Sequence, residues 1–295
     1  MTTVTADTRA KRKRIRGVLS FLLVVAGLLL MLYPVVATYF RNEQQANIAE
    51  AYRHSTVSGQ DFSYLIEQAH AYNRSTAGAP ILDPWLERVA KDNRPYQDYL
   101  EQLNVSGIPG SPMGAIAIPD IKVNLPIYHG TEPDVLERGI GHLYGSALPI
   151  GGENTHSVLT GHTGLASATL FDDLDKVTVS NRIYLDVAGY EMTYEVDQIE
   201  VVLPTEIDTL QPVPGEDLLT LVTCTPYGIN SHRLLVHAHR VPNEPAETTD
   251  AFNQGSSIQW WMFLVLGLML LIVVTYQVFR RRNAHPDGRH RRLGD

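Results

Sequence analysis

The stretch TLVTCTPYGINSHRLLVHAHR occupies residues 220–240 and carries the pattern on which the fold interpretation rests. On both sides of a turn rich in Pro, Gly and Asn, apolar and polar residues alternate, as they do in half-buried β-strands. If residues 218–223 and 233–239 pair as an antiparallel hairpin, Cys224 and Arg233 face each other across the loop. A guanidinium at that position would supply positive charge to a thiolate or to a developing oxyanion.

The same two-residue period continues upstream, in short segments separated by Pro, Gly, Asn and Asp. This pattern predicts an all-β barrel or sandwich. A short helix is expected over residues 133–138, with Thr131 as its N-cap. The further predicted strands cover residues 115–118, 123–127, 157–160, 182–187 and 192–203.

Residues 41–105 have a different composition, with few β-branched residues and many Glu, Gln, Ala and Arg, and we expect them to be helical. Asp61 could cap a helix that continues through Ala69. The segment 107–112 has Gly or Pro at four of its six positions and is predicted to be a linker.

Two uncharged, apolar runs flank the central part of the chain, at residues 17–40 and 251–279. Each exceeds the roughly 20 residues that a helix needs to cross a bilayer. Each also adjoins an Arg-rich cluster, and such clusters stay in the cytoplasm. Both ends of the chain are therefore expected inside, with the segment between the runs outside. A cleaved signal peptide is the alternative for the first run.

The charge distribution argues against a nucleic-acid partner. Residues 1–17 carry a net charge of +5 and residues 280–295 a net charge of +4, whereas residues 41–259 hold 12 basic and 29 acidic residues, a net charge of −17. Phosphate binding requires a basic footprint, which this central segment lacks.

The chain contains one cysteine, Cys224, and so forms no intrachain disulfide. A lone thiol outside the cell is either buried and inert or kept for its reactivity. His162 closes a predicted strand at the turn GHTG, residues 161–164, and a His beside a Cys can act as general acid or base in acyl transfer. Spacing alone does not separate it from His129, His142, His156 and His232. His237 and His239 share one strand face, but two ligands without a third do not predict a metal site.

The string TLVTC, Arg233 nine residues after its cysteine, and TGH at residues 160–162 resemble the sortases, cysteine transpeptidases of Gram-positive cell surfaces. The similarity continues through HGTEPDVLERGIGHLYGSALPIGG and THSVLTGHTGL, and ends at Arg240. The resemblance implies a closed eight-stranded β-barrel and no cofactor. It also implies that Cys224 is the nucleophile, His162 the general acid/base and Arg233 the stabiliser of substrate and oxyanion.

The second membrane run, the helical extension and the tripeptide Asp83-Pro84-Trp85 resemble the class C branch, the pilin polymerases. In that branch an Asp-Pro-aromatic lid covers the active site. The local sequence also fits a helix start, with Asp83 as the cap and Pro84 in the first helical position.

The expected fold class is mainly β, a closed sortase-type barrel with an N-terminal helical extension and two transmembrane helices. The expected segments are a basic cytoplasmic tail (1–17), a transmembrane helix (18–40), the helical extension with the lid (41–110), the catalytic barrel (111–242), a linker (243–257), a second transmembrane helix (258–279) and a second basic cytoplasmic tail (280–295).

The expected function is a membrane-anchored transpeptidase that cleaves an LPxTG-like sorting signal between Thr and Gly and joins the acyl group to an amine, with a pilin lysine favoured. The alternatives are a housekeeping-type sortase that uses the amine of a peptidoglycan precursor, a cysteine protease whose intermediate is resolved by water, and a non-catalytic scaffold. The expected partners are LPxTG-bearing surface proteins or pilins, the acceptor amine and the lipid bilayer.

Overall fold

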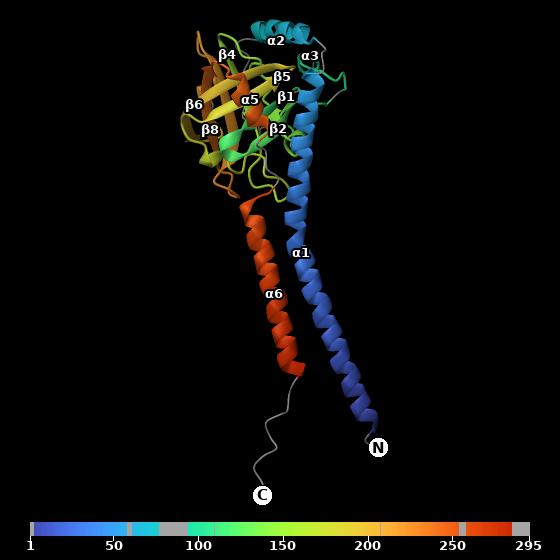
Figure 1. Cartoon of the computed structure of the whole chain (residues 1–295). Helices are drawn as coiled ribbons and strands as arrows, with labels where there is room; N and C mark the ends of the chain where they lie inside the picture. The colour runs from blue at the N-terminus through green and yellow to red at the C-terminus, as the bar shows by residue number, and fades with distance from the viewer. Residues whose placement is uncertain are drawn as a thin grey trace. The chain divides into compact units, whose positions relative to one another are not determined.

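The computed structural model describes residues 3–57, 61–76, 94–108, 110–206, 208–253 and 258–284 (Figure 1). The chain divides into two compact units, one made of residues 40–257 and one made of the two ends of the chain. The end unit contains the apolar part of helix α1 (Thr3–Val57) and helix α6 (Trp260–Ala284). Both helices are long and apolar enough, by length and composition, to cross a membrane.

The unit of residues 40–257 is built around a closed barrel with the strand order β1-β2-β3-β4-β7-β8-β6-β5. The pairs β2–β3 and β4–β7 are parallel, and the other pairs are antiparallel. This architecture confirms the expected eight-stranded barrel. The strands are β1 (Gly114–Ile118), β2 (Val123–His129), β3 (Ile140–His142), β4 (Thr155–Thr160), β5 (Arg182–Val187), β6 (Tyr190–Val202), β7 (Asp217–Thr225) and β8 (His232–Val241).

The alternation of side chains along the strands separates the barrel interior from its outer face. On β1, Ile116 and Ile118 belong to the large interior core. Ala115 and Ala117 instead face outward, into a second cluster shared with residues of α1 and of α5 (Pro245–Phe252). Because alanine is small, these two positions allow both helices to approach the barrel wall closely.

Helix α2 (Ser63–Thr76) lies across one end of the barrel, where Leu65 joins the interior core (Figure 1). The Asp61 carboxylate accepts a hydrogen bond from the backbone N–H of Ser63 at 2.9 Å, as expected of a helix cap. The Asn73 amide donates to the carbonyl of Leu148 at 3.2 Å and accepts from its N–H at 2.8 Å. Helix α2 is therefore fixed to the barrel by a buried amide as well as by apolar packing.

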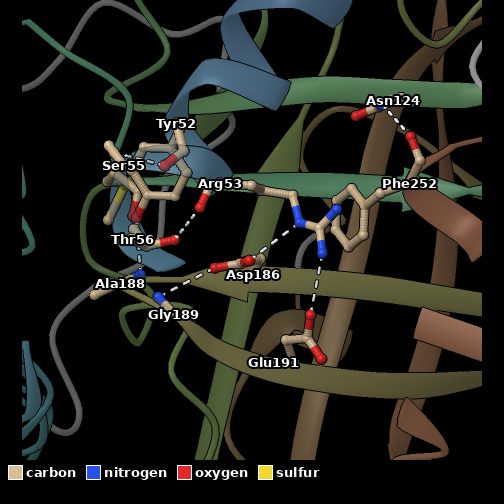
Figure 2. A network of polar contacts seen from close by, with 11 residues as sticks. Tyr52, Arg53, Ser55, Thr56, Asn124, Asp186, Ala188, Gly189, Glu191 and Phe252 are labelled. Atoms are coloured by element: carbon tan, nitrogen blue, oxygen red, sulfur yellow. Dashed lines mark hydrogen bonds and ion pairs between the residues drawn. The ribbon is translucent and has the colours of Figure 1, made fainter. Parts of the chain in front are cut away.

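The last turns of α1 meet α5 on the outer face of the barrel at a group of residues that we term the anchor cluster: Tyr52, Arg53, Asp186, Glu191 and Phe252. Arg53 donates to Asp186 and to Glu191, each at 3.1 Å, and its guanidinium lies 4.0 Å from the centroid of the Phe252 ring (Figure 2). The Asp186 side chain is only 1% exposed, so this ion pair is largely removed from water.

Backbone groups complete the anchor cluster. The Tyr52 hydroxyl donates to the carbonyl of Met113 at 2.7 Å and accepts from the N–H of Ala188 at 2.8 Å. The Asn124 amide donates to the carbonyl of Phe252 at 2.6 Å (Figure 2). Residues 52, 124 and 252 are far apart in the sequence, and the fold holds them together by these specific bonds.

Some local expectations differ from the structure. Strand β3 was not predicted, because its three residues are too few to show a period. Helix α4 (Pro133–Leu136) is shorter than expected, and its N-cap is Glu132, without a side-chain capping bond, so Thr131 was the wrong choice. The expected linker at 243–257 contains α5, whose first position is a proline.

Candidate active site

Cys224 and Arg233 lie directly opposite each other at the end of the β7–β8 hairpin, which confirms the expected register. Directly opposed residues point to the same face of a sheet, with Cα atoms about 4.5–5.5 Å apart. Each residue is 8% exposed. The hairpin therefore places a thiol and a guanidinium side by side in a largely desolvated position.

The loop between β7 and β8 also holds the guanidinium. Arg233 Nη1 donates to the carbonyl of Asn230 at 3.4 Å and to the carbonyl of His232 at 3.3 Å. These carbonyls fix the direction of the cation relative to the sheet. A buried, oriented guanidinium is a suitable donor for an oxyanion or for a substrate carbonyl.

The strand that ends just before His162 is bound to the strand that carries Cys224. Strand β4 runs parallel to β7, and beyond the last paired residues the N–H of Gly161 donates to the carbonyl of Val222 at 3.1 Å. The Thr223 hydroxyl then donates to the carbonyl of Gly161 at 2.7 Å. The residue just before His162 is thus tied to the two residues just before Cys224, which brings these side chains to the same end of the sheet.

Gly161 is needed for this approach. A Cβ atom at this position would lie 2.6 Å from the ring of Phe171 and 2.8 Å from Ile140. A larger residue would therefore require these side chains or the backbone next to His162 to move. The N–H of Phe171 in turn donates to the carbonyl of His162 at 3.1 Å, which fixes the start of the loop that follows.

Asp172 holds the far side of the His162 loop. Its carboxylate accepts from the N–H of Gly164 at 2.7 Å and from the Thr163 hydroxyl at 3.3 Å. Burial raises the pKa of Asp172 to about 6, although these hydrogen bonds oppose the shift. Burial also lowers the pKa of His162, with a smaller opposing effect from the charge of Glu137.

An apolar patch lies beside these residues on the outer face of β4, β7 and β8, under the segment that joins β6 to β7. Val222 and Leu235 precede Cys224 and follow Arg233 by two positions each, so they share the face of the thiol and the guanidinium. The patch consists of Leu143, Val158, Leu210, Val222 and Leu235. All five side chains are buried, so the patch packs the segment that joins β6 to β7 against the sheet beside the thiol and the guanidinium.

Comparison with known proteins shows the family to which the chain belongs. The family model described as "Sortase domain" matches residues 116–241. Sortase A from Corynebacterium diphtheriae is 50% identical, with 72% of this chain and 94% of that chain covered and a TM-score of 0.61. This chain belongs to the sortase family. The sortase is therefore a cysteine transpeptidase.

Further relatives of this sortase include sortases of class C. Sortase C-1 from Actinomyces oris is 50% identical, with 61% of this chain and 98% of that chain covered and a TM-score of 0.58. Sortase A from Streptococcus agalactiae is 28% identical over 239 residues, which is 80% of this chain and 88% of the relative.

The structure also assigns partners to the histidines that sequence spacing left open. His142 is fully buried between the Tyr99 hydroxyl, 2.9 Å from Nδ1, and the carbonyl of Ala147, 2.8 Å from Nε2. Burial lowers its pKa to about 3 and lowers the pKa of His129 to about 4. Both side chains therefore stay neutral at physiological pH and serve the packing of the sortase barrel.

The other histidines that sequence spacing left open also have polar partners. His232 Nδ1 lies 2.8 Å from the Ser231 hydroxyl. His239 Nδ1 lies 2.9 Å from an Asp197 carboxylate oxygen. His156 Nε2 and His237 Nδ1 form a chain with Thr220, at 2.7 Å and 2.8 Å from its hydroxyl oxygen.

The proposed lid residues Asp83, Pro84 and Trp85 lie outside the described residues. Sequence reasoning missed two residues that shape the site, Thr223 and Asp172. Thr223 adjoins the cysteine in TLVTC, so its place in the motif could have drawn attention to it. Asp172 lies ten residues after His162 without any motif, and only the tertiary structure shows its role.

Proposed function

We propose that this sortase is a membrane-anchored, class C enzyme that cleaves an LPxTG-like sorting signal between Thr and Gly and joins the acyl group to a pilin lysine. The proposal rests mainly on the position of three residues at one end of the sheet. Cys224 lies opposite Arg233, and Gly161, just before His162, is hydrogen-bonded to β7. These are the groups that acyl transfer requires, placed on neighbouring strands.

In the proposed mechanism the Cys224 thiolate attacks the Thr carbonyl carbon of the sorting signal. The C–S bond forms as the carbonyl becomes a tetrahedral oxyanion, which Arg233 stabilises with its N–H groups. The His162 imidazolium gives its proton to the Gly nitrogen as the C–N bond breaks. A thioester and a free amino terminus result.

The second half of the reaction reverses these roles. An incoming amine attacks the thioester, His162 takes a proton from it, and the Cys224 thiolate leaves. An ordinary Cys titrates near pH 8.5 and an ordinary His near pH 6.5. Since burial lowers the pKa of His162, the thiolate–imidazolium form is a minor fraction of the enzyme at neutral pH. The reaction rate should therefore be highest at the pH at which the thiolate–imidazolium fraction is largest.

The description of one solved neighbour supports the proposed acceptor. A sortase C from Streptococcus pneumoniae, 38% identical, is described in terms of its pilin substrate specificity. This description supports a pilin lysine as the acceptor here. The alternative acceptor is the amine of a peptidoglycan precursor. The similarity to sortase A proteins supports this alternative.

The lid remains part of the proposal. Asp83 would pair with Arg233 and Trp85 would cover Cys224 in a resting state, which lowers apparent substrate affinity by the open fraction. Helix α2, which precedes this segment in the sequence, is fixed to the barrel. Asp83→Ala combined with Trp85→Ala should speed modification of Cys224 by a thiol reagent. A lower melting temperature without faster labelling would support the helix-cap role instead.

The two apolar helices support membrane anchoring of the sortase. With the basic clusters inside, residues 41–255 would lie on the cell-wall side. A reporter that is active only outside the cytoplasm should work when fused after Pro245 and fail when fused after Arg292. Activity of the second fusion would contradict this topology.

The central test is incubation of the full chain, in detergent, with an LPxTG peptide, followed by intact-mass measurement. The expected product is an adduct on Cys224 that lacks the part of the peptide starting at Gly. A pilin domain with its lysine and a peptidoglycan-precursor amine are then offered as competing acceptors. Absence of any adduct, or release only by water, would contradict the transpeptidation proposed here.

A further inference from the structure

One amide side chain joins helix α1 to the loop that follows His162. Asn42 lies in the part of α1 that belongs to the barrel unit. Its Nδ2 donates to the Thr169 hydroxyl at 2.7 Å, and its Oδ1 accepts from the Thr169 N–H at 3.0 Å. Because both polar atoms of the amide bond to the same residue, Asn42 fixes the orientation of Thr169 as well as its position.

The residue after Thr169 has a strained backbone. Leu170 has a φ of +43°, in the left-handed region. That region is unfavourable for a bulky side chain, and such a conformation persists only where the surrounding contacts hold it. The turn lets both Leu170 and Phe171 enter the interior core, where they are 2% and 0% exposed. The conformation at Leu170 is therefore maintained by burial on one side and by the bonds of Thr169 on the other.

This strained turn leads directly to the backbone of His162. The N–H of Phe171 donates to the carbonyl of His162 at 3.1 Å, and the Phe171 ring occupies the space next to Gly161. The N–H of Asp172 donates to the carbonyl of Thr169 at 2.8 Å. Thr169 is thus bonded to α1 through its N–H and hydroxyl, and to the end of the loop through its carbonyl.

Asp172 closes the loop at the residues just after His162. Its Oδ1 accepts from the N–H of Gly164 at 2.7 Å and from the Thr163 hydroxyl at 3.3 Å. Residues 163–172 therefore form a loop closed by its own hydrogen bonds, and Asn42 ties this closed loop to α1. A displacement of Thr169 would be passed on to the backbone on both sides of His162.

We propose that Asn42 is a positioning residue of this sortase. By holding Thr169 it keeps the strained turn at Leu170 in place, and with that turn the backbone of His162. The effect on the reaction rests on the proposed role of His162 in proton transfer, whereas the effect on the loop does not. Helix α1, which is long and apolar enough to cross a membrane, thus also contributes to the placement of a reacting group.

Loss of the Asn42 amide should act on kcat more than on KM. Without it, the N–H and hydroxyl of Thr169 lose their partner, and Leu170 can relax toward an ordinary backbone conformation. The N–H of Phe171 then no longer points at the carbonyl of His162. Proton transfer is sensitive to displacements of about 1 Å. Binding of the peptide does not use Asn42, so its KM should change little.

Three variants of α1 separate positioning from helix stability. Asn42→Leu removes both polar atoms at similar volume. Asn42→Asp keeps two oxygen acceptors, one for the Thr169 N–H and one for the Thr169 hydroxyl, which can rotate to donate. Asn47→Leu is the matched control, because Asn47 is exposed on the same helix and its described contacts include no bond to residues 163–172.

The first measurement is amide hydrogen exchange of the full chain in detergent, which needs no substrate. Protection factors of residues 163–172 should fall about tenfold in Asn42→Leu, the size of one to two hydrogen bonds. They should keep the values of the unmodified protein in Asn42→Asp and in Asn47→Leu, and strand β7 should keep its protection in all variants. An equal loss of protection throughout the barrel would show that Asn42 only stabilises the fold, and would overturn the proposal.

The second measurement is kcat and KM for an LPxTG peptide, with kcat expressed per folded molecule. In Asn42→Leu, kcat should fall about tenfold and KM should change less than about twofold. Asn42→Asp should restore most of the lost kcat, which a loss of packing alone would not allow. An unchanged kcat in Asn42→Leu, or the same loss in Asn47→Leu, would overturn the proposal.

Thr169→Val tests whether the two bonded residues act together. It removes the hydroxyl and keeps the N–H that donates to Asn42, so kcat should fall less than in Asn42→Leu. The double variant should be no slower than Asn42→Leu alone, because residues that act through one contact are not additive. Additive losses would overturn the proposal. If the unmodified protein does not cleave the peptide, the proposed function fails, and the protection of residues 163–172 alone decides whether Asn42 positions the loop.

Discussion

Two regions of the barrel hold their residues in place by different means. In the anchor cluster, Arg53 meets Asp186 and Phe252 through an ion pair and a cation–π contact between side chains from distant parts of the chain. At the proposed catalytic end, Cys224 and Arg233 are aligned by the register of two paired strands. The first region depends on particular side chains, and the second depends on backbone pairing.

This difference separates stability from chemistry. A side chain lost from the anchor cluster leaves a buried partner without its counter-charge, which destabilises the fold. A side chain lost at the proposed catalytic end should leave the strand pairing intact and remove a group to which we assign a role in the reaction. The substitutions below test this separation.

Cys224→Ala should have the largest effect on the reaction. The nucleophile is lost, so adduct formation with an LPxTG peptide should disappear, as intact-mass measurement would show. The strand register does not depend on the thiol, and stability should change by less than about 1 kcal/mol. Peptide cleavage by this variant would refute a cysteine mechanism.

Arg53→Met should have the largest effect on stability. Burial already raises the pKa of Asp186, and Arg53 opposes that shift. Without the cation, the buried carboxylate should cost about 3–5 kcal/mol, measured by denaturation of the full chain in detergent. The kcat of the folded fraction should not change.

The matched control for this loss is Arg53→Met combined with Asp186→Asn, which removes both charges. It should recover much of the lost stability. If the double variant were as unstable as the single one, the apolar contact of Arg53 with Phe252, and not its charge, would hold α1 and α5 together.

Thr223→Val tests the side-chain bond that ties the backbone of Gly161, next to His162, to β7. The buried carbonyl of Gly161 loses its hydroxyl donor, so we expect kcat to fall about tenfold, the equivalent of roughly 1.4 kcal/mol, with little change in KM. Thr223→Ser keeps the donor and should retain most of the activity. Equal losses in both variants would point to packing of the methyl group.

Asp172→Asn should show a smaller effect whose sign depends on pH. The folded protein binds a proton at Asp172 with a pKa of about 6, while an unfolded Asp titrates near pH 3.9. Between these values the folded state holds more protons, so the stability of the unmodified protein falls as pH rises toward and past 6. Asparagine does not ionise.

The melting temperature of Asp172→Asn relative to the unmodified protein should therefore increase between pH 5 and pH 7. Thermal denaturation at a series of pH values measures this difference. A constant difference across the range would mean that the pKa of Asp172 is not raised in the folded protein.

Much of the catalytic end could be predicted from the sequence because its geometry is local. The turn residues between positions 224 and 233 imply a hairpin, and a hairpin determines which residues oppose each other. The pairing of β4 with β7 joins residues about 60 positions apart, and no local pattern encodes it. The place of His162 beside β7 followed from family resemblance.

The other regions depend on tertiary contacts. Helix α5 was expected to be a linker, because eight residues are too few to show a clear helical period. Its apolar residues are buried only by contact with Ala115 and Ala117 of the barrel. The chain of His156, Thr220 and His237 draws one residue from each of three strands. It could not be recognised before the strand order and register were known.

The single cysteine has a consequence for oxidation. A sulfenic acid formed on Cys224 has no second thiol among the 295 residues with which to form an internal disulfide. Its return to the thiol depends on a reductant from outside the chain. Because these residues contain no second cysteine, reduction of an oxidised Cys224 is a bimolecular reaction with that external reductant.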